Sequence, residues 1–170
     1  AAIVSKDSLD AGSTRWAQGG VAAVLDQEDT VEAHVNDTLI AGAGLCHEPS
    51  VRHTIKHSTA AIQWLIDLGV PFDQGENGEN FHLTREGGHS VRRIIHAADA
   101  TGVAISNTLQ KAAKAKKNLH LLTDYIAVDL ITGEKLGQKK QGCFGAYFLN
   151  KATGEVEVIT ASSVVLATGG

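Results

Sequence analysis

The sequence predicts an α/β fold in which helices cover a parallel sheet. Residues 1–4 form a short apolar run that is followed by a polar segment, and this pattern is typical of a buried parallel strand. Three segments between residues 31 and 113 carry apolar side chains at helical spacing. Residues 163–168 form a second apolar run, and the glycine pair Gly169-Gly170 follows it, so we expect another buried strand there.

The first two helices are bounded by clear signals. Asp29 or Thr30 can cap the first one, and the glycine-rich residues 41–44 end it. Pro49 suits the first turn of the second helix, which we expect to end at Gly69. This pair of helices is expected to cover the sheet.

A third helix and several further strands are predicted downstream of a turn-rich segment. Residues 71–80 have the composition of an exposed loop without a specific role. The third helix follows Thr101, and residues 119–131 alternate in part and contain β-formers. Residues 143–149 and 155–160 predict a hairpin, which would complete a β-meander.

The composition narrows the function classes. A chain of 170 residues with 43% hydrophobic residues fits about one globular domain. The net charge of −4 gives no electrostatic case for nucleic acid or an anionic membrane, and no apolar run approaches the ~20 residues of a membrane span. Cys46 and Cys143 match no metal or redox spacing and predict reduced thiols, which favours a cytoplasmic setting.

One glycine-rich loop can wrap a polar, planar ligand. Its glycines leave N–H groups open to close approach, its hydroxyls can donate hydrogen bonds, and its amide can both donate and accept. Taken alone, such a loop is equally consistent with an ordinary turn. The loop reads Ser13-Thr14-Arg15-Trp16-Ala17-Gln18-Gly19-Gly20.

Three further motifs follow the loop at residues 83–90, 96–102 and 165–170. In this order the four segments resemble flavoproteins of the succinate dehydrogenase and fumarate reductase superfamily, and within it most closely the L-aspartate oxidases. The resemblance covers residues 1–170 and implies part of a Rossmann-like FAD-binding domain, with the segment leading toward a capping domain. It also implies that a first strand with its G-x-G-x-x-G turn precedes residue 1, and that capping and helical domains follow residue 170.

The resemblance implies FAD as the cofactor, bound by Lys6 and by the whole loop from Ser13 to Gly20. Ile126 and Ala127 would contact the adenine through their backbone at the end of a strand, although a plain strand interior is the alternative for this pair. Covalent members of the superfamily carry a histidine where Ser13 stands. Noncovalent FAD is therefore expected.

The resemblance places Glu86 in the segment that faces the substrate, where a carboxylate can meet the ammonium group of L-aspartate. The alternatives are that Glu86 pairs with Arg85 or Arg92, or faces water. Arg85, Arg92 and Arg93 could neutralise substrate carboxylates or hold the loop through backbone carbonyls, and we expect the second role for at least two of them. His89 is expected to be structural.

His96 is likewise expected to be structural rather than a general base. His53 and His57 share a helical face, but no third ligand is evident and we expect no metal. The family's catalytic arginine and histidine are implied to lie after residue 170, so no catalytic acid or base is expected in this chain.

The implied activity is oxidation of L-aspartate to iminoaspartate, with oxygen or fumarate as acceptor, as the first step of a bacterial route to NAD. The implied partners are these small molecules and quinolinate synthase, which would receive iminoaspartate. Two alternatives stay open. One is a soluble fumarate reductase or succinate oxidoreductase, and the other is a piece that binds without turnover when isolated.

Overall fold

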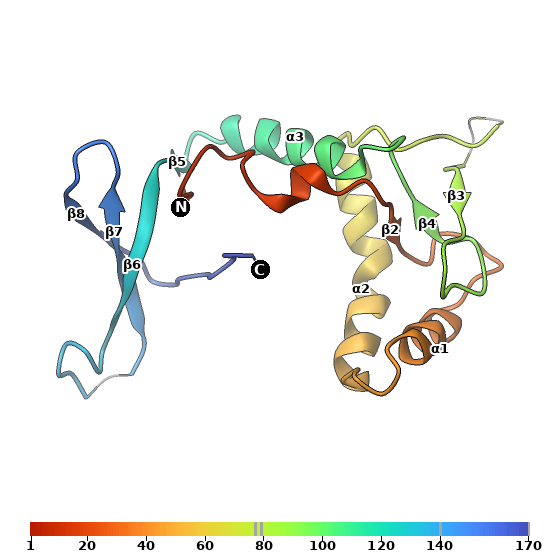
Figure 1. The fold of residues 1–170 in the computed structure, drawn as a ribbon, viewed down its shortest axis with the longest axis horizontal. Coiled ribbons are helices and arrows are strands. Elements are labelled where there is room, and N and C mark those ends of the chain that lie inside the picture. Colours follow the sequence, from red (N-terminus) through yellow and green to blue (C-terminus); the bar gives the residue numbers. More distant parts are fainter. Residues whose placement is uncertain (77, 79, 140, 170) are drawn as a thin grey trace. The chain divides into compact units, whose positions relative to one another are not determined.

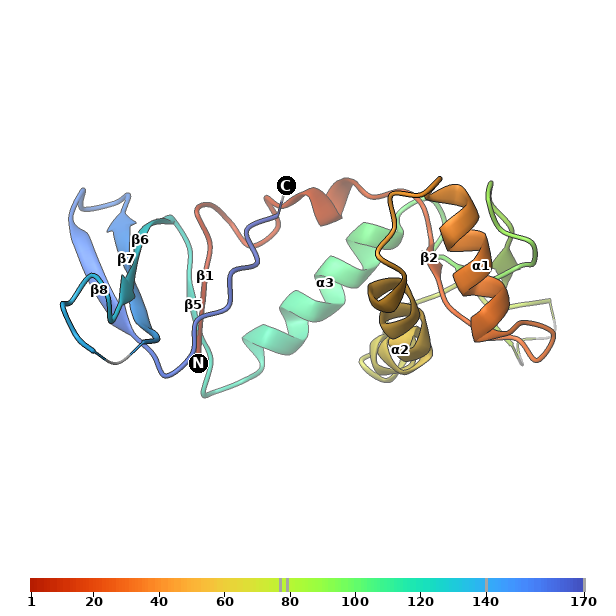
Figure 2. The same cartoon turned by 90° about the horizontal axis from the view of Figure 1, so that it is seen from below.

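The computed structural model describes all residues except 77, 79, 140 and 170, and the chain divides into two compact units (Figures 1 and 2). The first unit combines residues 1–13 with residues 113–170, and the second is Thr14–Ala112. Parallel strands, helices and a β-meander are all present, so the predicted α/β class is confirmed. No helix in the described part of the chain is long and apolar enough to cross a membrane.

A short parallel sheet opens the first unit. Strand β1 (Ala2–Val4) pairs in parallel with β5 (His120–Leu122), with Ile3 opposite Leu121. The predicted parallel strand is confirmed, but its predicted burial is wrong, since Ile3 is 43% exposed. The described part of this unit supplies only two parallel strands, and a sheet of that size cannot bury both faces of a strand.

The predicted β-meander is confirmed in the same unit. Strands β6 (Tyr125–Thr132), β7 (Cys143–Asn150) and β8 (Val156–Thr160) pair antiparallel in the order β6-β7-β8. Gly145 has a φ of 149°, and a Cβ atom there would lie 2.2 Å from the carbonyl oxygen of Ile159. Only glycine lets the two strands approach so closely at this point.

Three polar side chains join the strands of the meander. The Tyr125 hydroxyl donates to the Glu157 carboxylate at 3.1 Å. The Asn150 amide donates to the Tyr125 oxygen at 3.0 Å and to Glu157 at 2.8 Å. Each strand of the meander therefore contributes one member of a closed hydrogen-bonded triangle.

The apolar run near the end of the chain is not a strand, so that prediction is wrong. Residues 163–169 pair with no described strand, and Val165 and Leu166 are 85% and 63% exposed. A strand needs a neighbour for its backbone hydrogen bonds, and none of the described strands supplies one here. Gly170, the last residue of the predicted strand, lies outside the described residues.

The helices of the second unit follow the sequence signals. Helix α1 (Val31–Ala41) is capped by Thr30, whose hydroxyl accepts a hydrogen bond from the Ala33 amide at 3.1 Å. Helix α2 (Glu48–Asp67) carries Pro49 in its first turn, and the two helices pack on each other (Figure 1). Helix α3 spans Thr101–Lys114. Each of the three predicted helices is confirmed.

A small antiparallel sheet in this unit was not predicted. Strands β2 (Val21–Ala22), β4 (Ile94–Ile95) and β3 (Leu83–Thr84) pair in the order β2-β4-β3. Helix α2 packs against this sheet. The expectation that the helix pair covers the parallel sheet stays a prediction. Strands of two residues carry no measurable alternation, and so periodicity could not reveal them.

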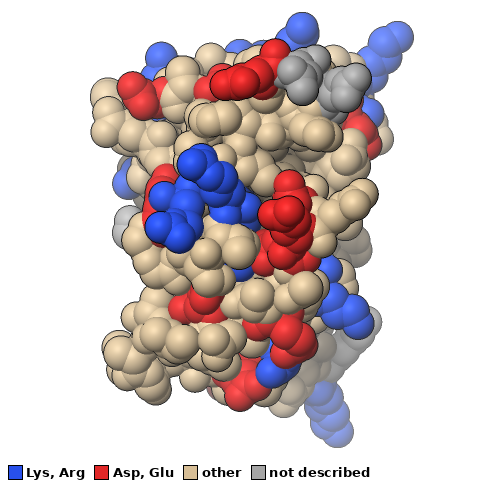
Figure 3. Space-filling view, turned by 90° about the vertical axis from the view of Figure 1, so that its right-hand side faces the viewer, with Lys and Arg blue, Asp and Glu red and all other residues tan. Residues whose placement is uncertain are grey.

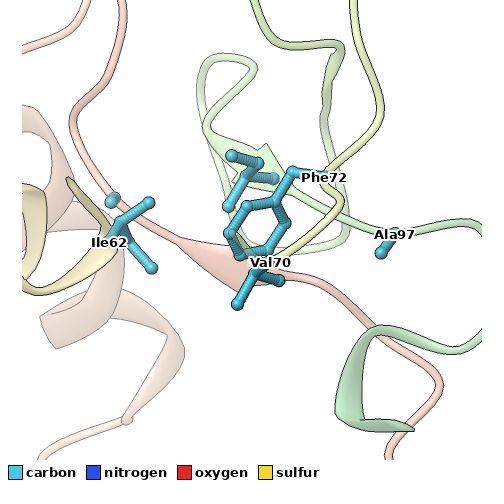
Figure 4. Close-up of a cluster of buried hydrophobic side chains, with 6 residues drawn as sticks. Ile62, Val70, Phe72 and Ala97 are labelled. Carbon is cyan, nitrogen blue, oxygen red and sulfur yellow. The ribbon is translucent and has the colours of Figure 1, made fainter. Parts of the chain in front are cut away.

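The core of the second unit lies between α2 and this sheet. Val70 and Phe72 lie at its centre, with Ile62 coming from α2 and Ala97 from the segment after β4 (Figure 4). Phe72 is buried, so the predicted exposure of residues 71–80 fails at this position. Two residues of that loop, at positions 77 and 79, lie outside the described part of the chain.

Candidate functional site

The glycine-rich loop begins with a 3-10 turn, Ser13–Trp16, and packs on the first turn of α3. The Gly102 amide donates to the Ala17 carbonyl at 3.0 Å. A Cβ atom on Gly102 would lie 1.9 Å from the Thr14 carbonyl oxygen and 2.9 Å from Ala17. The missing side chain at Gly102 therefore lets loop and helix touch.

A hollow of about 220 Å³ lies between this loop and the start of α3. Its wall combines small apolar side chains with an indole ring, an amide and two charged groups. The lining residues are Arg15, Trp16, Ala17, Gln18, Asp99, Ala100 and Val103. The Trp16 side chain is 77% exposed, so its ring is open to contact. A flat apolar wall with polar groups at its rim fits part of a planar, polar ring system such as a flavin.

Lys6, which is predicted to bind FAD, lies near the predicted adenine-binding pair Ile126 and Ala127 in the first unit. The Tyr125 amide donates to the Ser5 carbonyl at 3.0 Å, which sets Lys6 beside the start of β6. The Lys151 ammonium group donates to the Lys6 carbonyl at 3.0 Å. Ile126 is 41% exposed and so is open to contact.

Ile126 and Ala127 lie at the beginning of β6, directly after its first residue, and their contact with adenine stays a prediction. Asp124 has a φ of 63° and breaks the apolar run between β5 and β6.

The remaining predicted residues divide between the units. Residues 14–20 and Glu86 belong to the second unit, whereas Lys6, Ser13, Ile126 and Ala127 belong to the first. Within the second unit, Glu86 opens a tight turn in which the His89 amide donates to the Glu86 carbonyl at 3.2 Å. Glu86 is exposed, and no described residue forms an ion pair with its carboxylate. The alternative of pairing with Arg85 or Arg92 finds no support in the described contacts.

A buried ion network lies behind this turn. Arg93 is 0% exposed and holds Asp29 through two hydrogen bonds of 2.8 Å. Its remaining terminal nitrogen donates to Asp37 on α1 at 2.7 Å. The Ser90 amide and hydroxyl also donate to the same Asp37 oxygen, each at 2.8 Å. The network thus fastens the end of the Glu86 turn to α1.

Of the three arginines, at least two of which are expected to hold the loop through backbone carbonyls, Arg92 is shown to do so, and Arg93 is not. Arg92 donates to the Leu83 carbonyl at 3.3 Å, whereas Arg93 acts through carboxylates instead of the expected carbonyls. Asp29 is one of those carboxylates and not the helix cap. The hydrogen bond from the Ser90 amide lowers the pKa of Asp37 from 3.8 to about 2; burial opposes this shift, and the Ser90 hydroxyl and Arg93 add to it.

Two histidine side chains, His34 and His89, lie next to this network. Burial and the charge of Arg93 lower the pKa of His34 below 6.5, so its ring is neutral near pH 7. The His34 ring lies 5.7 Å from that of His89, and the His89 Nδ1 atom lies 3.3 Å from Arg93. Sequence analysis missed this cluster. Its one signal is that His34 and Asp37 share a helix face.

His96 contacts two polar side chains of the same unit. Its Nδ1 atom lies 2.9 Å from the Asp73 carboxylate, and its Nε2 atom lies 3.0 Å from His82. The Ala98 amide donates to the same carboxylate at 3.0 Å, so the contacts tie two loops together. No group of three or more histidine, cysteine or acidic residues placed to hold a metal occurs among the described residues.

A second hollow, of about 860 Å³, lies beside β3. Its lining includes the basic residues Arg85 and Arg92 and the acidic residues Asp26 and Glu28. Basic and acidic side chains gather next to each other on the face shown in Figure 3. Because the two signs lie side by side, this face has no extended patch of one charge in that view.

Known proteins resemble this chain along almost its whole length. L-Aspartate oxidase of Pseudomonas aeruginosa is 59% identical over 99% of this chain, which spans 32% of that protein. L-Aspartate oxidase 1 of Ralstonia nicotianae is 53% identical over 99% of the chain, again 32% of the relative. The chain thus spans about a third of the length of these relatives.

A solved structure and a family assignment agree with these similarities. A variant of E. coli quinol fumarate reductase superposes with a TM-score of 0.90 at 28% identity, covering 99% of this chain and 28% of that protein. The resemblance to this group of flavoproteins, drawn from the motifs, is confirmed. A family described as an FAD binding domain matches residues 1–170. The chain therefore belongs to the FAD binding domain family, whose cofactor is FAD.

Proposed function

We propose that this chain is part of an L-aspartate oxidase, which oxidises L-aspartate to iminoaspartate. The observation that carries the proposal is the 59% identity to an L-aspartate oxidase over 99% of the chain. The exposed, unpaired Glu86 carboxylate in the described structure supports it, because only an aminated dicarboxylate offers that carboxylate a cation. A dicarboxylate such as succinate would gain nothing from a further anion there.

Different residues of this chain would bind the cofactor and the substrate. Residues 14–20 would line the flavin ring, and Lys6, Ser13, Ile126 and Ala127 would complete the contacts to FAD. Bound FAD would accept the two electrons of the oxidation. Glu86 would hold the substrate ammonium group, while the catalytic acid and base come from segments beyond residue 170. In the domain organisation we propose, residues 1–170 form an incomplete FAD-binding domain.

The proposal extends to the cellular setting. Oxygen or fumarate would reoxidise the cofactor, and the product would enter NAD biosynthesis in the cytoplasm by transfer to quinolinate synthase. The full-length enzyme tests this reading directly. Peroxide release with L-aspartate under air, and succinate formation from fumarate without air, support the proposal. Turnover of succinate without any turnover of aspartate would instead identify a succinate oxidoreductase.

FAD is expected to be held without a covalent bond, because Ser13 has no imidazole to form one. Acid precipitation of the full-length holoenzyme should therefore release the yellow chromophore into the supernatant. Absorbance of supernatant and pellet at the flavin bands measures the partition. Flavin that remains with the denatured pellet would contradict the prediction.

Gly102→Ala is expected to weaken FAD binding by about fivefold, because the added methyl group collides with the Thr14 carbonyl and pushes the loop off α3. Titration of the full-length apoenzyme with FAD, followed by flavin fluorescence, measures the change. Gly12→Ala is the matched control, since a Cβ atom at Gly12 meets nothing within 4 Å. Unchanged affinity in Gly102→Ala would show that the loop tolerates displacement.

A further inference from the structure

We propose that Asp37 is a positioning residue that holds the turn carrying Glu86 in the geometry needed to select L-aspartate. Asp37 lies on α1, 53 residues before Ser90, so the two are neighbours only in the folded chain. This inference rests on the proposed function, because it concerns how the same substrate contact is kept in place.

One oxygen atom of Asp37 anchors the turn. It accepts hydrogen bonds from the amide and the hydroxyl of Ser90 at 2.8 Å each, and from Arg93 at 2.7 Å. Ser90 follows Glu86 by only four residues. Arg93 is itself held by two hydrogen bonds to Asp29, so the anchor is tied to two elements at once.

The other described contacts of the turn are the hydrogen bond from the His89 amide to the Glu86 carbonyl and the packing of His89 against Arg93 and His34, and neither involves the two glycines after Glu86. A Cβ atom on Gly87 would meet nothing within 4 Å, and one on Gly88 would meet only Ala41 at 3.6 Å. Glycine has the greatest backbone freedom of any residue, so two of them beside Glu86 leave its direction undetermined locally. The hydrogen bonds to Asp37 therefore supply the order that the turn's own sequence lacks.

Asp37 acts through Glu86 and does not meet the substrate itself. It is buried, with only 9% exposure, and the oxygen that faces the turn is already occupied by three donors. A charge-assisted hydrogen bond to an ammonium group depends on the position of the carboxylate, so a loose turn weakens the contact without removing it.

The test compares variants of the full-length enzyme in two separate reactions. One is aspartate oxidation with oxygen as acceptor, and the other is fumarate reduction with a chemical electron donor in place of aspartate. Ser90→Ala removes one donor and keeps the buried charges, whereas Asp37→Asn removes the charge. Each is expected to lower kcat/KM for aspartate by about three- to tenfold, mainly through KM, because a neutral or missing hydrogen bond replaces a charged one. Fumarate reduction should stay within about twofold of wild type. Ser90→Thr keeps the hydroxyl and should restore aspartate selectivity.

Double substitutions separate positioning from general structural damage. In a Glu86→Gln background, Ser90→Ala and Asp37→Asn should cause no further loss of the aspartate-to-fumarate ratio, since the contact they position is already gone. Thr38→Ala is the matched control on α1, because the Thr38 hydroxyl donates within its own helix to His34. It should leave the ratio unchanged.

The outcomes distinguish the positioning role of Asp37 from the proposed function of the enzyme. Additive losses in the double variants, or equal losses in both reactions, would overturn the positioning role while leaving the proposed function intact. A wild-type enzyme that does not oxidise aspartate would overturn the proposed function, and the role of Asp37 in selecting aspartate would fall with it.

Discussion

Replacing Glu86 by glutamine in the full-length enzyme is expected to lower kcat/KM for L-aspartate by roughly tenfold to a hundredfold. The range follows because a hydrogen bond to a charged group contributes about 1.5–3 kcal/mol. Only aspartate presents an ammonium group, so fumarate reduction should change little. Much of the loss is expected in KM, because the contact already exists in the bound substrate.

Steady-state kinetics with both substrates measures the separation between the two activities. Glu76→Gln is the matched control, since Glu76 is an exposed glutamate of the same unit that belongs to no predicted site. Equal losses of both activities would make Glu86 a structural residue. Unchanged aspartate kinetics would remove it from the substrate site.

Arg93→Met is expected to destabilise the folded protein by about 3–5 kcal/mol, because it leaves two buried carboxylates without their cation. Arg93 is fully buried between Asp29 and Asp37, and a methionine of similar length keeps most of the packing. The shift in the urea midpoint of the full-length protein, with the denaturant slope checked for two-state behaviour, measures the effect.

Arg52→Met is the matched control for the buried arginine. Arg52 also contacts two carboxylates, Glu32 and Glu48, at 2.8 Å, but its side chain is 45% exposed. Water screens such surface pairs, so the control should cost far less. Adding Asp29→Asn and Asp37→Asn to Arg93→Met should recover part of the stability, since the loss comes from orphaned charges. Similar losses at both arginines would refute the burial argument.

Local signals in the sequence predicted the helices and the meander well. Thr30 and Pro49 mark helix starts through hydrogen bonding and backbone geometry that depend on neighbouring residues alone. The alternation in residues 143–160 is long enough to show the hairpin. Strands β2, β3 and β4 are too short to show any period, and the exposed segment at Val165 depends on partner strands that no local pattern reports.

The candidate site divides in the same way. Loop chemistry drew attention to residues 13–20, and the family resemblance drew attention to Glu86; these roles stay predictions. The network behind the turn could not be found, because Arg93 meets Asp37 and Asp29 across 56 and 64 residues of sequence. In the sequence alone, a buried arginine cannot be told from a surface arginine, because the difference depends on partners that are distant in the chain. Asp29, beside Thr30, carried an equally good local signal for a helix cap. In the folded chain Thr30 caps the helix instead, and the Asp29 carboxylate bonds elsewhere.

The hydrogen-bonded triangle of Tyr125, Asn150 and Glu157 bears on the fidelity of folding. Side chains alternate across a strand, so a slip of one residue in β6, β7 or β8 would turn one member to the opposite face and break its bonds to the other two. A slip in register that only exchanges one apolar neighbour for another, such as valine for leucine, costs little free energy by comparison. The triangle therefore destabilises meanders whose strands pair in the wrong register while they are still forming. It favours one alignment of the two hairpins.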